Sequence, residues 1–221
     1  MNISHRFVVI AAIFVTCLIT ANVLAVKVIS VGSVILPAAI IIFPISYIFG
    51  DILTEVYGYR LTRRVIWLGF LCNLIFVAFA WLGQLLPPAP LWEGQSAYET
   101  ILGYTPRLLA ASFCGYLIGE FANSFILARM KILTKGRWLW TRTIGSTVVG
   151  QGLDSSIFIT LAFVGTPAFM PILILYHWLA KTAIEALATP FTYAVVNFLK
   201  GKDAVDTYDY QTNFNPFAIS D

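Results

Sequence analysis

The stretch "FGDILTEVYGYRLTRR", residues 49–64, decides the fold. The apolar run "VILPAAIIIFPISYIF" (34–49) leads into it, and two carboxylates, a Gly-Tyr pair and three arginines follow. Asp51 and Glu55 are four residues apart, so they share one face of a helix. A change from apolar residues to cations occurs at the end of a buried soluble helix and at the end of a membrane span. The composition of the whole chain decides between the two.

Composition indicates a membrane protein. Of the 221 residues, 59% are hydrophobic and 11% are charged, and the mean hydropathy is +0.82. Soluble domains carry about 25% charged residues, so this chain has too few to cover a surface that faces water, and we expect a polytopic membrane protein. The net charge of +3 includes no Lys/Arg run that suggests nucleic-acid binding. An odd number of cysteines without a CxxC motif argues against a disulfide framework; they are Cys17, Cys72 and Cys114.

The apolar segments predict an all-α bundle of six transmembrane helices, because each is close to the roughly 20 residues that cross a bilayer. The first apolar run is longer than the core of a signal peptide, so we interpret it as a retained span. The connection at 87–107 is too short for a domain and has the aromatic residues of an interfacial loop. The domain 1–202 is followed by a polar cytoplasmic tail, 203–221, expected to be mobile. The predicted spans are 6–29, 34–57, 64–86, 106–128, 142–164 and 171–198.

The distribution of cations predicts the orientation. Cytoplasmic loops of membrane proteins carry an excess of Lys and Arg, and eleven of the fourteen here fall on the side that holds both termini and the arginines of the opening stretch. We therefore expect N-in and C-in topology in a bacterial inner membrane. Glu55 is expected to reach this interface and to pair with Arg60 or Arg63.

Ionisable residues inside the spans indicate a site. A charge in the hydrocarbon costs about 2.5–3.5 kcal/mol on insertion scales, so such residues usually face a cavity or a partner. Asp154 and Lys181 lie near the middle of their spans, and we expect a buried pair for which Glu185 competes. The alternative, that polar groups only join helices, is favoured for Thr54, Asn73, Gln84 and Thr147.

The chemistry of these side chains suits a planar polar heterocycle. A carboxylate accepts two parallel hydrogen bonds, a carboxamide offers a donor and an acceptor, and an aromatic face stacks on a flat base. Many other small polar solutes fit as well. Familiar hydrolase, prenyl-transfer and ATPase motifs are absent from the sequence, and only two histidines occur. We therefore expect no enzyme, no catalytic residue, no metal site and no cofactor, with energy supplied by a gradient or a partner.

Three motifs carry a resemblance to a known family: "FPISYIFGDILTEVYGYRLTRR" (43–64), "GSTVVGQGLDSSIFI" (145–159) and "AKTAIEALATPF" (180–191). Here the chain resembles the queuosine precursor transporters of the vitamin uptake transporter group, over about residues 30–198. The resemblance implies inner-membrane uptake of 7-cyano-7-deazaguanine and 7-aminomethyl-7-deazaguanine, precursors salvaged for tRNA modification. The positions that it marks as substrate-binding are Asp51, Asp154 and Lys181, with Glu120, Asn123, Gln151 and Glu185 matching a subset of the family.

The combined prediction is transport by alternating access through a mid-membrane site. Asp51 and Glu120 would guard the cytoplasmic half, Asp154, Gln151 and Glu185 would read the base edge, and Lys181 would balance charge, with Trp178 or a tyrosine stacking on the base. The alternatives are a substrate-binding subunit for a separate ATPase module, as in energy-coupling vitamin uptake, and an assembly protein without a ligand. The preferred deazapurine, ion coupling and oligomeric state stay open; Gly145, Gly150 and Gly152 permit close helix approach within one chain or in a homodimer.

Overall fold

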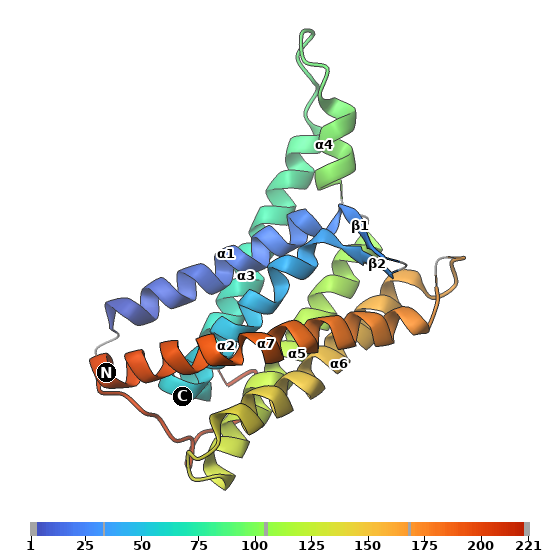
Figure 1. Ribbon diagram of the computed structural model, residues 1–221. Coiled ribbons are helices and arrows are strands. Elements are labelled where there is room, and N and C mark those ends of the chain that lie inside the picture. The colour runs from blue at the N-terminus through green and yellow to red at the C-terminus, as the bar shows by residue number, and fades with distance from the viewer. Residues whose placement is uncertain (1–3, 33, 104–105, 168, 219–221) are drawn as a thin grey trace.

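The protein is a bundle of long helices that carries a small β-hairpin at one end. The computed structural model describes residues 4–32, 34–103, 106–167 and 169–218, so the first three and the last three residues of the predicted domains lie outside the described part. Figure 1 shows the hairpin and the short helix α4 at one end of the bundle and both chain ends toward the opposite side. We call these the hairpin end and the terminal end.

The helices begin and end within five residues of the predicted spans, except in the second span, which was predicted to begin at residue 34 but starts as a strand, with its α-helix beginning at Phe43. Two strands, a 3-10 helix and one short α-helix are additions to the prediction. The hairpin pairs Val28 with Pro37 and Ser30 with Ile35, and α4 lies in the connection expected to be a loop. The elements are α1 (His5–Ala25), β1 (Val28–Val31), β2 (Val34–Pro37), the 3-10 helix η1 (Ala38–Ile41), α2 (Phe43–Tyr57), α3 (Tyr59–Leu85), α4 (Gln95–Leu102), α5 (Pro106–Leu133), α6 (Leu139–Phe163) and α7 (Ile172–Asp203).

Five helical segments of the described chain are long and apolar enough to cross a membrane. They are α1, Ala38–Tyr57, α3, Gln95–Leu133 and α7. The helix α6, although 25 residues long, is not among them, and Gln151 and Asp154 lower its apolar character. It nevertheless packs along α5 and α7 inside the bundle. The prediction of a helical membrane protein is confirmed.

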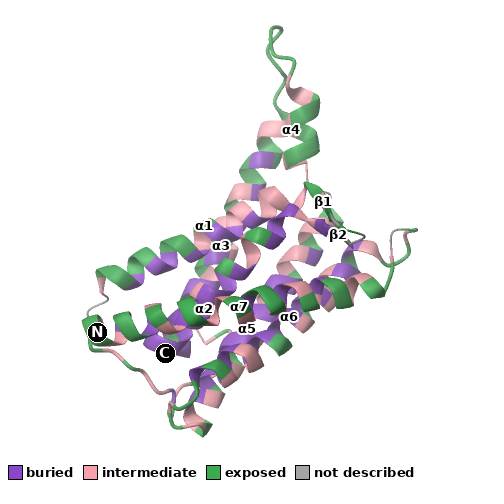
Figure 2. Cartoon of the chain, viewed as in Figure 1, coloured by how far each residue is buried: buried purple, intermediate pink, exposed green. Residues whose placement is uncertain are grey.

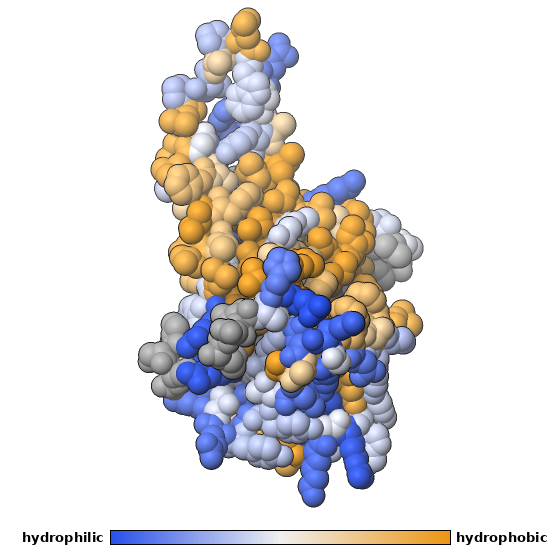
Figure 3. Space-filling model, turned by 90° about the vertical axis from the view of Figure 1, so that its left-hand side faces the viewer, coloured by the Kyte–Doolittle hydropathy of each residue, from blue (hydrophilic) through white to orange (hydrophobic). Residues whose placement is uncertain are grey.

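The surface is divided between apolar and polar side chains. Seen from the left-hand side of Figure 1, hydrophilic side chains gather over the lower part of the molecule and hydrophobic ones cover the part above (Figure 3). Large apolar side chains on the long helices point outward, including Leu71, Phe79, Leu179 and Phe198. An outward-facing apolar band with a polar end is the arrangement that a lipid bilayer stabilises.

The Gly-Tyr pair in the opening stretch makes the turn between α2 and α3. Gly58 has a φ of +86°, which favours glycine. A Cβ at Gly58 would lie 2.7 Å from Cγ2 of Thr207, so there is no room for a side chain. The backbone N–H of Tyr59 donates to both carboxylate oxygens of Asp209, at 3.2 and 3.1 Å. The turn at the end of α2 therefore packs against the chain that follows α7 and hydrogen-bonds to it.

The segment after α7 packs against the bundle, which differs from the expected mobile tail. Arg63 donates to the backbone oxygens of Asn213 at 2.8 Å and Asn215 at 2.7 Å. The indole of Trp67 donates to the oxygen of Pro216 at 2.8 Å. Buried Arg63 would otherwise lack acceptors, because the predicted partner Glu55 is bound elsewhere. We call residues 204–218 the docked segment.

The interior of the bundle is partly polar. Figure 2 shows buried residues concentrated along the inner faces of α2, α5 and α6. Apolar residues of α1, α2, α3 and α5 form the main core, among them Phe14, Ile52, Leu53 and Ile66. Beside this core lie ionisable side chains buried on α2, α5, α6 and α7. Burying such groups costs free energy unless they are paired. These side chains are therefore candidates for a functional site.

Candidate functional site

A cavity of about 440 Å³ enters the bundle from the hairpin end. Its walls come from the end of α1, the hairpin, the α4–α5 connection and the start of α5, and its polar floor comes from α6 and α7. Its volume lies in the roughly 300–1,000 Å³ range of small-molecule sites. Lining residues include Asn22, Phe43, Ser112, Asp154, Phe158, His177 and Lys181.

Asp154 and Lys181 form the polar floor of this cavity. The Lys181 ammonium donates to Oδ2 of Asp154 at 2.5 Å, and the predicted pairing of these two residues is confirmed. The same ammonium lies 3.9 Å from the centre of the Phe43 ring, which is a cation–π distance. Both side chains keep a small exposed fraction, 6% for Asp154 and 10% for Lys181. A solute that reaches the floor can therefore compete with either partner.

Three further carboxyl groups lie deeper than the cavity floor. Asp51 on α2, Glu120 on α5 and Glu185 on α7 are buried and lie close enough to act on one another electrostatically. Asn123 donates to Oδ1 of Asp51 at 2.7 Å, and Thr147 donates to Oε1 of Glu185 at 2.5 Å. We call Asp51, Glu120 and Glu185 the carboxyl cluster. Glu185 thus bonds Thr147 and does not compete for Lys181, contrary to expectation.

Several polar atoms around the carboxyl cluster make no complete hydrogen bond within the described residues. They include both oxygens of Glu120, Oε2 of Glu185 and Oδ1 of Asn123. Gln151 approaches Glu185, but neither end of its carboxamide completes a bond, and the Tyr47 hydroxyl is likewise unpaired. Buried polar atoms are normally satisfied. The concentration of unpaired polar atoms makes this region a candidate for the functional site.

Glycines bring α5 and α6 together at this level. A Cβ at Gly119 would lie 2.8 Å from the Tyr47 hydroxyl and 2.9 Å from the backbone oxygen of Gly150. A Cβ at Gly150 would lie 2.7 Å from Cβ of Asn123. The two helices therefore touch through backbone atoms, as small residues allow in membranes. This close approach sets the position of Asp154 relative to Glu120.

Replacing Gly119 with alanine is expected to destabilise the protein by about 1–3 kcal/mol, because the new methyl group has no space and must push α6 away. The apparent melting temperature in detergent measures this loss. The matched control is Gly201→Ala on α7, where nothing lies within 4 Å of the added Cβ. Equal melting temperatures for the two variants would show that α5 and α6 do not pack as described.

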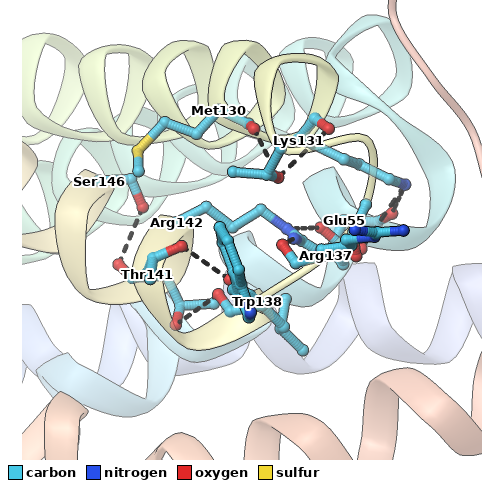
Figure 4. A network of polar contacts seen from close by, with 12 residues as sticks. Glu55, Met130, Lys131, Arg137, Trp138, Thr141, Arg142 and Ser146 are labelled. Atoms are coloured by element: carbon cyan, nitrogen blue, oxygen red, sulfur yellow. Dashed lines mark hydrogen bonds and ion pairs between the residues drawn. The ribbon is translucent and has the colours of Figure 1, made fainter.

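Glu55 is the centre of an ion-pair network at the terminal end. Arg142 holds its carboxylate through two hydrogen bonds, Nε to Oε2 at 2.7 Å and Nη2 to Oε1 at 2.9 Å. Lys200 donates to Oε1 at 2.5 Å, and the Lys131 ammonium lies 3.6 Å from Oε1. Figure 4 shows Arg142 and Lys131 converging on Glu55. The expected pairing of Glu55 with Arg60 or Arg63 is wrong, because Glu55 is fully buried and points into the bundle.

The docked segment completes this network. Lys131 also donates to Oδ1 of Asp206 at 2.6 Å and to the backbone oxygen of Thr207 at 2.7 Å, and Lys200 lies 2.8 Å from Asp206. Burial pushes the pKa of Asp206 upward, but the hydrogen bonds from Lys131 and Lys200 outweigh this effect and leave the pKa below its usual value. The network therefore gains stability from Asp206 at neutral pH, and loses it as the pH falls through that lowered pKa.

Trp178 lies apart from the other predicted site residues. Its indole N–H donates to the backbone oxygen of Val148 at 2.8 Å, and it is not among the residues that line the cavity. The aromatic rings at the cavity are Phe43, Phe158 and Phe163. The remaining predicted site residues do not line the cavity either, and they are buried behind its floor. They are Asp51, Glu120, Asn123, Gln151 and Glu185.

A second groove is a weaker candidate. Its volume is about 550 Å³, and it lies between α1 and α3. Its lining is almost wholly apolar, with Thr16 and Arg64 as exceptions. Such a groove on the outside of a membrane helix pair offers little to orient a polar solute, whereas the first cavity combines an apolar wall with a charged floor.

Comparison with known proteins assigns the chain to a family. A family model described as "Putative vitamin uptake transporter" matches residues 37–195, which include α2 to α6 and most of α7. The chain belongs to the vitamin uptake transporter family. This confirms the resemblance found in the sequence, and it means that the protein is a transporter and not an enzyme. As a transporter with several membrane-spanning helices, it is a multi-pass protein of the bacterial inner membrane.

Two curated relatives of this vitamin uptake transporter carry more specific names. The "Probable queuosine precursor transporter" of Bacillus subtilis (strain 168) is 30% identical over 180 residues, covering 80% of this chain and 78% of that protein. The "Queuosine precursor transporter" of Escherichia coli (strain K12) is 25% identical over 148 residues, covering 65% of this chain and 61% of that protein. No solved structure matches the chain.

Sequence reasoning missed the partners of Glu55. Arg142, Lys131 and Lys200 were explained by topology alone, as cations at the cytoplasmic side. The available signal was that Glu55 follows Asp51 by one turn, so a helix that turns Asp51 inward must also turn Glu55 inward.

Proposed function

We propose that this transporter takes up queuosine precursors, 7-cyano-7-deazaguanine and 7-aminomethyl-7-deazaguanine. The observation that carries the proposal is the cavity with Asp154 and Lys181 at its floor, in a chain whose relatives are named queuosine precursor transporters. Within the described residues, the cavity reaches the charged floor from the hairpin end, as a substrate site in one state of an alternating-access cycle would be reached.

The topology that fits this function has six spans with both termini in the cytoplasm. In it α6 is the fifth span along the chain, held between α5 and α7, where its polar face is shielded from lipid. The terminal end then faces the cytoplasm, and the hairpin end with the cavity mouth faces outward. The cations of the opening stretch and the Lys131–Arg142 turn lie at the cytoplasmic end, as the excess of positive charge in inner loops requires.

The substrate chemistry suits the floor of the cavity. Asp154 can accept the ring N–H and the exocyclic amino group of a deazaguanine in parallel, in place of the Lys181 ammonium. Lys181 then stays close enough to balance the charge, and Phe43 or Phe158 supplies the flat contact expected of the predicted stacking residue. As the bundle closes over the solute, Gln151, Asn123 and the carboxyl cluster would come within reach of the base.

Alternating access requires a closed opposite end, and the Glu55 network forms one. It joins α2, α5, α6, α7 and the docked segment through direct hydrogen bonds. The described conformation therefore fits a state that is open outward and closed inward. Opening inward would require α7 or α6 to withdraw its cation from Glu55.

Uptake by the purified protein in liposomes tests the function. Radiolabelled 7-cyano-7-deazaguanine is expected to enter proteoliposomes, and unlabelled deazaguanine should compete while a pyrimidine should not. Empty liposomes are the control. Binding without uptake, together with co-purification of an ATPase, would instead favour the substrate-binding subunit of an energy-coupling system. Absence of both binding and uptake across a panel of purine-like solutes would overturn the proposal.

A further inference from the structure

The carboxyl cluster forms a layer of its own between the cavity floor and the Glu55 network. From the hairpin end to the terminal end, α6 and α7 each carry first a residue of the cavity floor, then one at the level of the carboxyl cluster, and then one of the Glu55 network. On α7 the order is Lys181, Glu185, Lys200, and on α6 it is Asp154, Gln151, Arg142. On α2, Asp51 precedes Glu55 by one turn. The cluster is therefore placed where a group carried between the two ends would have to pass.

The cluster contains no counter-charge. In the described part of the chain, no ion pair involves Asp51, Glu120 or Glu185. The nearest cations are already bound: Lys181 pairs with Asp154, and Arg142 pairs with Glu55. Three ionised carboxylates buried together without a cation would repel one another strongly in a medium of low dielectric constant. Some of these carboxyls must carry protons.

Hydrogen-bond accounting leads to the same conclusion from geometry. Around the cluster, the unpaired acceptors include both oxygens of Glu120, Oε2 of Glu185 and Oδ1 of Asn123, and the unpaired donors include Nε2 of Gln151 and the hydroxyls of Tyr47 and Ser155. Three of these acceptors are carboxyl oxygens, and within the described chain none of the donors completes a hydrogen bond to them. A protonated carboxyl supplies a hydroxyl donor, and Asp51 and Glu185 lie close enough to share one proton.

We propose that Asp51, Glu120 and Glu185 form a proton-binding site that couples substrate uptake to proton entry. This inference rests on the proposed function. Protons reach the cluster through the outward-facing cavity past Asp154, and they leave to the cytoplasm once the Glu55 network opens. No bond other than the carboxyl O–H forms or breaks. Carboxyls buried inside spans commonly serve as proton relays.

The groups that face each carboxyl define the site. Asp51 faces Glu185, Glu120 and Glu55, with Asn123 as its hydrogen-bond donor. Glu120 faces Glu185 and Asp154, and the Tyr47 hydroxyl lies close enough to be influenced by the same carboxyls. The Tyr116 hydroxyl donates to the backbone oxygen of Ile66. Glu185 faces Asp51, Thr147 and Gln151. The bound proton is thus shared among neighbours that are all neutral or acidic, which favours its retention until the layer is opened.

Proteoliposomes with a pH gradient test the coupling. Radiolabelled 7-cyano-7-deazaguanine is added outside at a pH one unit below the interior, and the external pH is followed with an indicator dye in weak buffer. With one proton per substrate, this gradient drives accumulation up to about tenfold. The expected result is stimulated uptake with alkalinisation of the medium in a fixed ratio. Glu120→Gln and Glu185→Gln should lose the stimulation, whereas Glu93→Gln on the exposed connection should keep it.

Each outcome is decisive. Uptake that proceeds equally with and without the gradient, and without alkalinisation, overturns proton coupling while leaving the proposed function intact. Full stimulation in glutamine variants that still transport assigns the proton elsewhere and also overturns the inference. If the glutamine variants fail to fold, absence of alkalinisation by the wild-type protein still overturns the inference. Absence of uptake under every gradient overturns the proposed function, and the coupling falls with it.

Discussion

Replacing Glu55 with glutamine is expected to cause a large loss of stability. Glu55 is fully buried, and the side chains of its partners Arg142 and Lys131 are each only 1% exposed. The variant keeps the shape of the side chain but leaves buried Arg142 without its carboxylate partner, whereas Lys131 keeps its ion pair with Asp206. Removing one partner from a buried ion pair costs about 3–5 kcal/mol, because the remaining charge stays in a low-dielectric interior. The additional bond to Lys200 places the effect toward the upper end.

Thermal unfolding in detergent measures this effect, and Glu93→Gln is the matched control. Glu93 is an exposed glutamate on the connection between α3 and α4, and its variant should melt with the wild-type protein. If Glu55→Gln had the same melting temperature as the wild type, the cations would be solvated by water or lipid headgroups. The description of a closed terminal end would then be wrong.

Substitutions at Asp154 and Lys181 should have the largest effect on transport. Asp154→Asn or Lys181→Ala removes one partner of the pair at the cavity floor, which at a binding site costs about 2–5 kcal/mol. This corresponds to a loss of roughly 30-fold or more in apparent affinity. Initial uptake rates of labelled deazaguanine, measured over a range of concentrations, give the loss directly. Wild-type rates in both variants would contradict the assigned role.

A double variant separates binding from folding. In Asp154→Asn with Lys181→Met, neither charge is left unpaired, so thermal stability should recover toward that of the wild type. Uptake should not recover, because the acceptor for the substrate is gone. The control is Leu179→Ala, whose side chain lies on the outer face of α7 and is 51% exposed. Recovery of both properties would mean that the pair only holds α6 to α7.

The fold could be predicted well wherever hydrophobicity alone determines it. Long apolar runs placed most helix ends to within five residues, although the α-helix of the second span starts nine residues later than predicted. The mid-span positions of Asp154 and Lys181 led to the prediction of their pairing. The hairpin at Val28–Pro37 was missed because a short apolar run is compatible with both a strand and a helix. The hydrogen bond from the Tyr59 backbone, next to Gly58, to Asp209 could not be predicted because 150 residues separate the two partners.

The sequence indicated which helices carry buried polar side chains, but not how these side chains are divided between the cavity floor and the carboxyl cluster. Sequence could place Asp154, Glu120 and Glu185 on polar helix faces, but it could not separate the cavity floor from the carboxyl cluster behind it. That division depends on the close contact of α5 and α6 at Gly119 and Gly150, which is a property of backbone approach. The docked segment was unpredictable for a similar reason, because Arg63 and Trp67 bind its backbone oxygens rather than side chains that a sequence would reveal.

The docked segment connects α7 to α3. It leaves α7 at Asp203 and is anchored on α3 by Arg63 and Trp67. Before these anchors, Asp206, Thr207 and Asp209 also bind the bundle, so a movement of α7 away from Glu55 would first have to break their contacts. The length of residues 204–212 would then limit how far α7 could move while Arg63 and Trp67 stay bound.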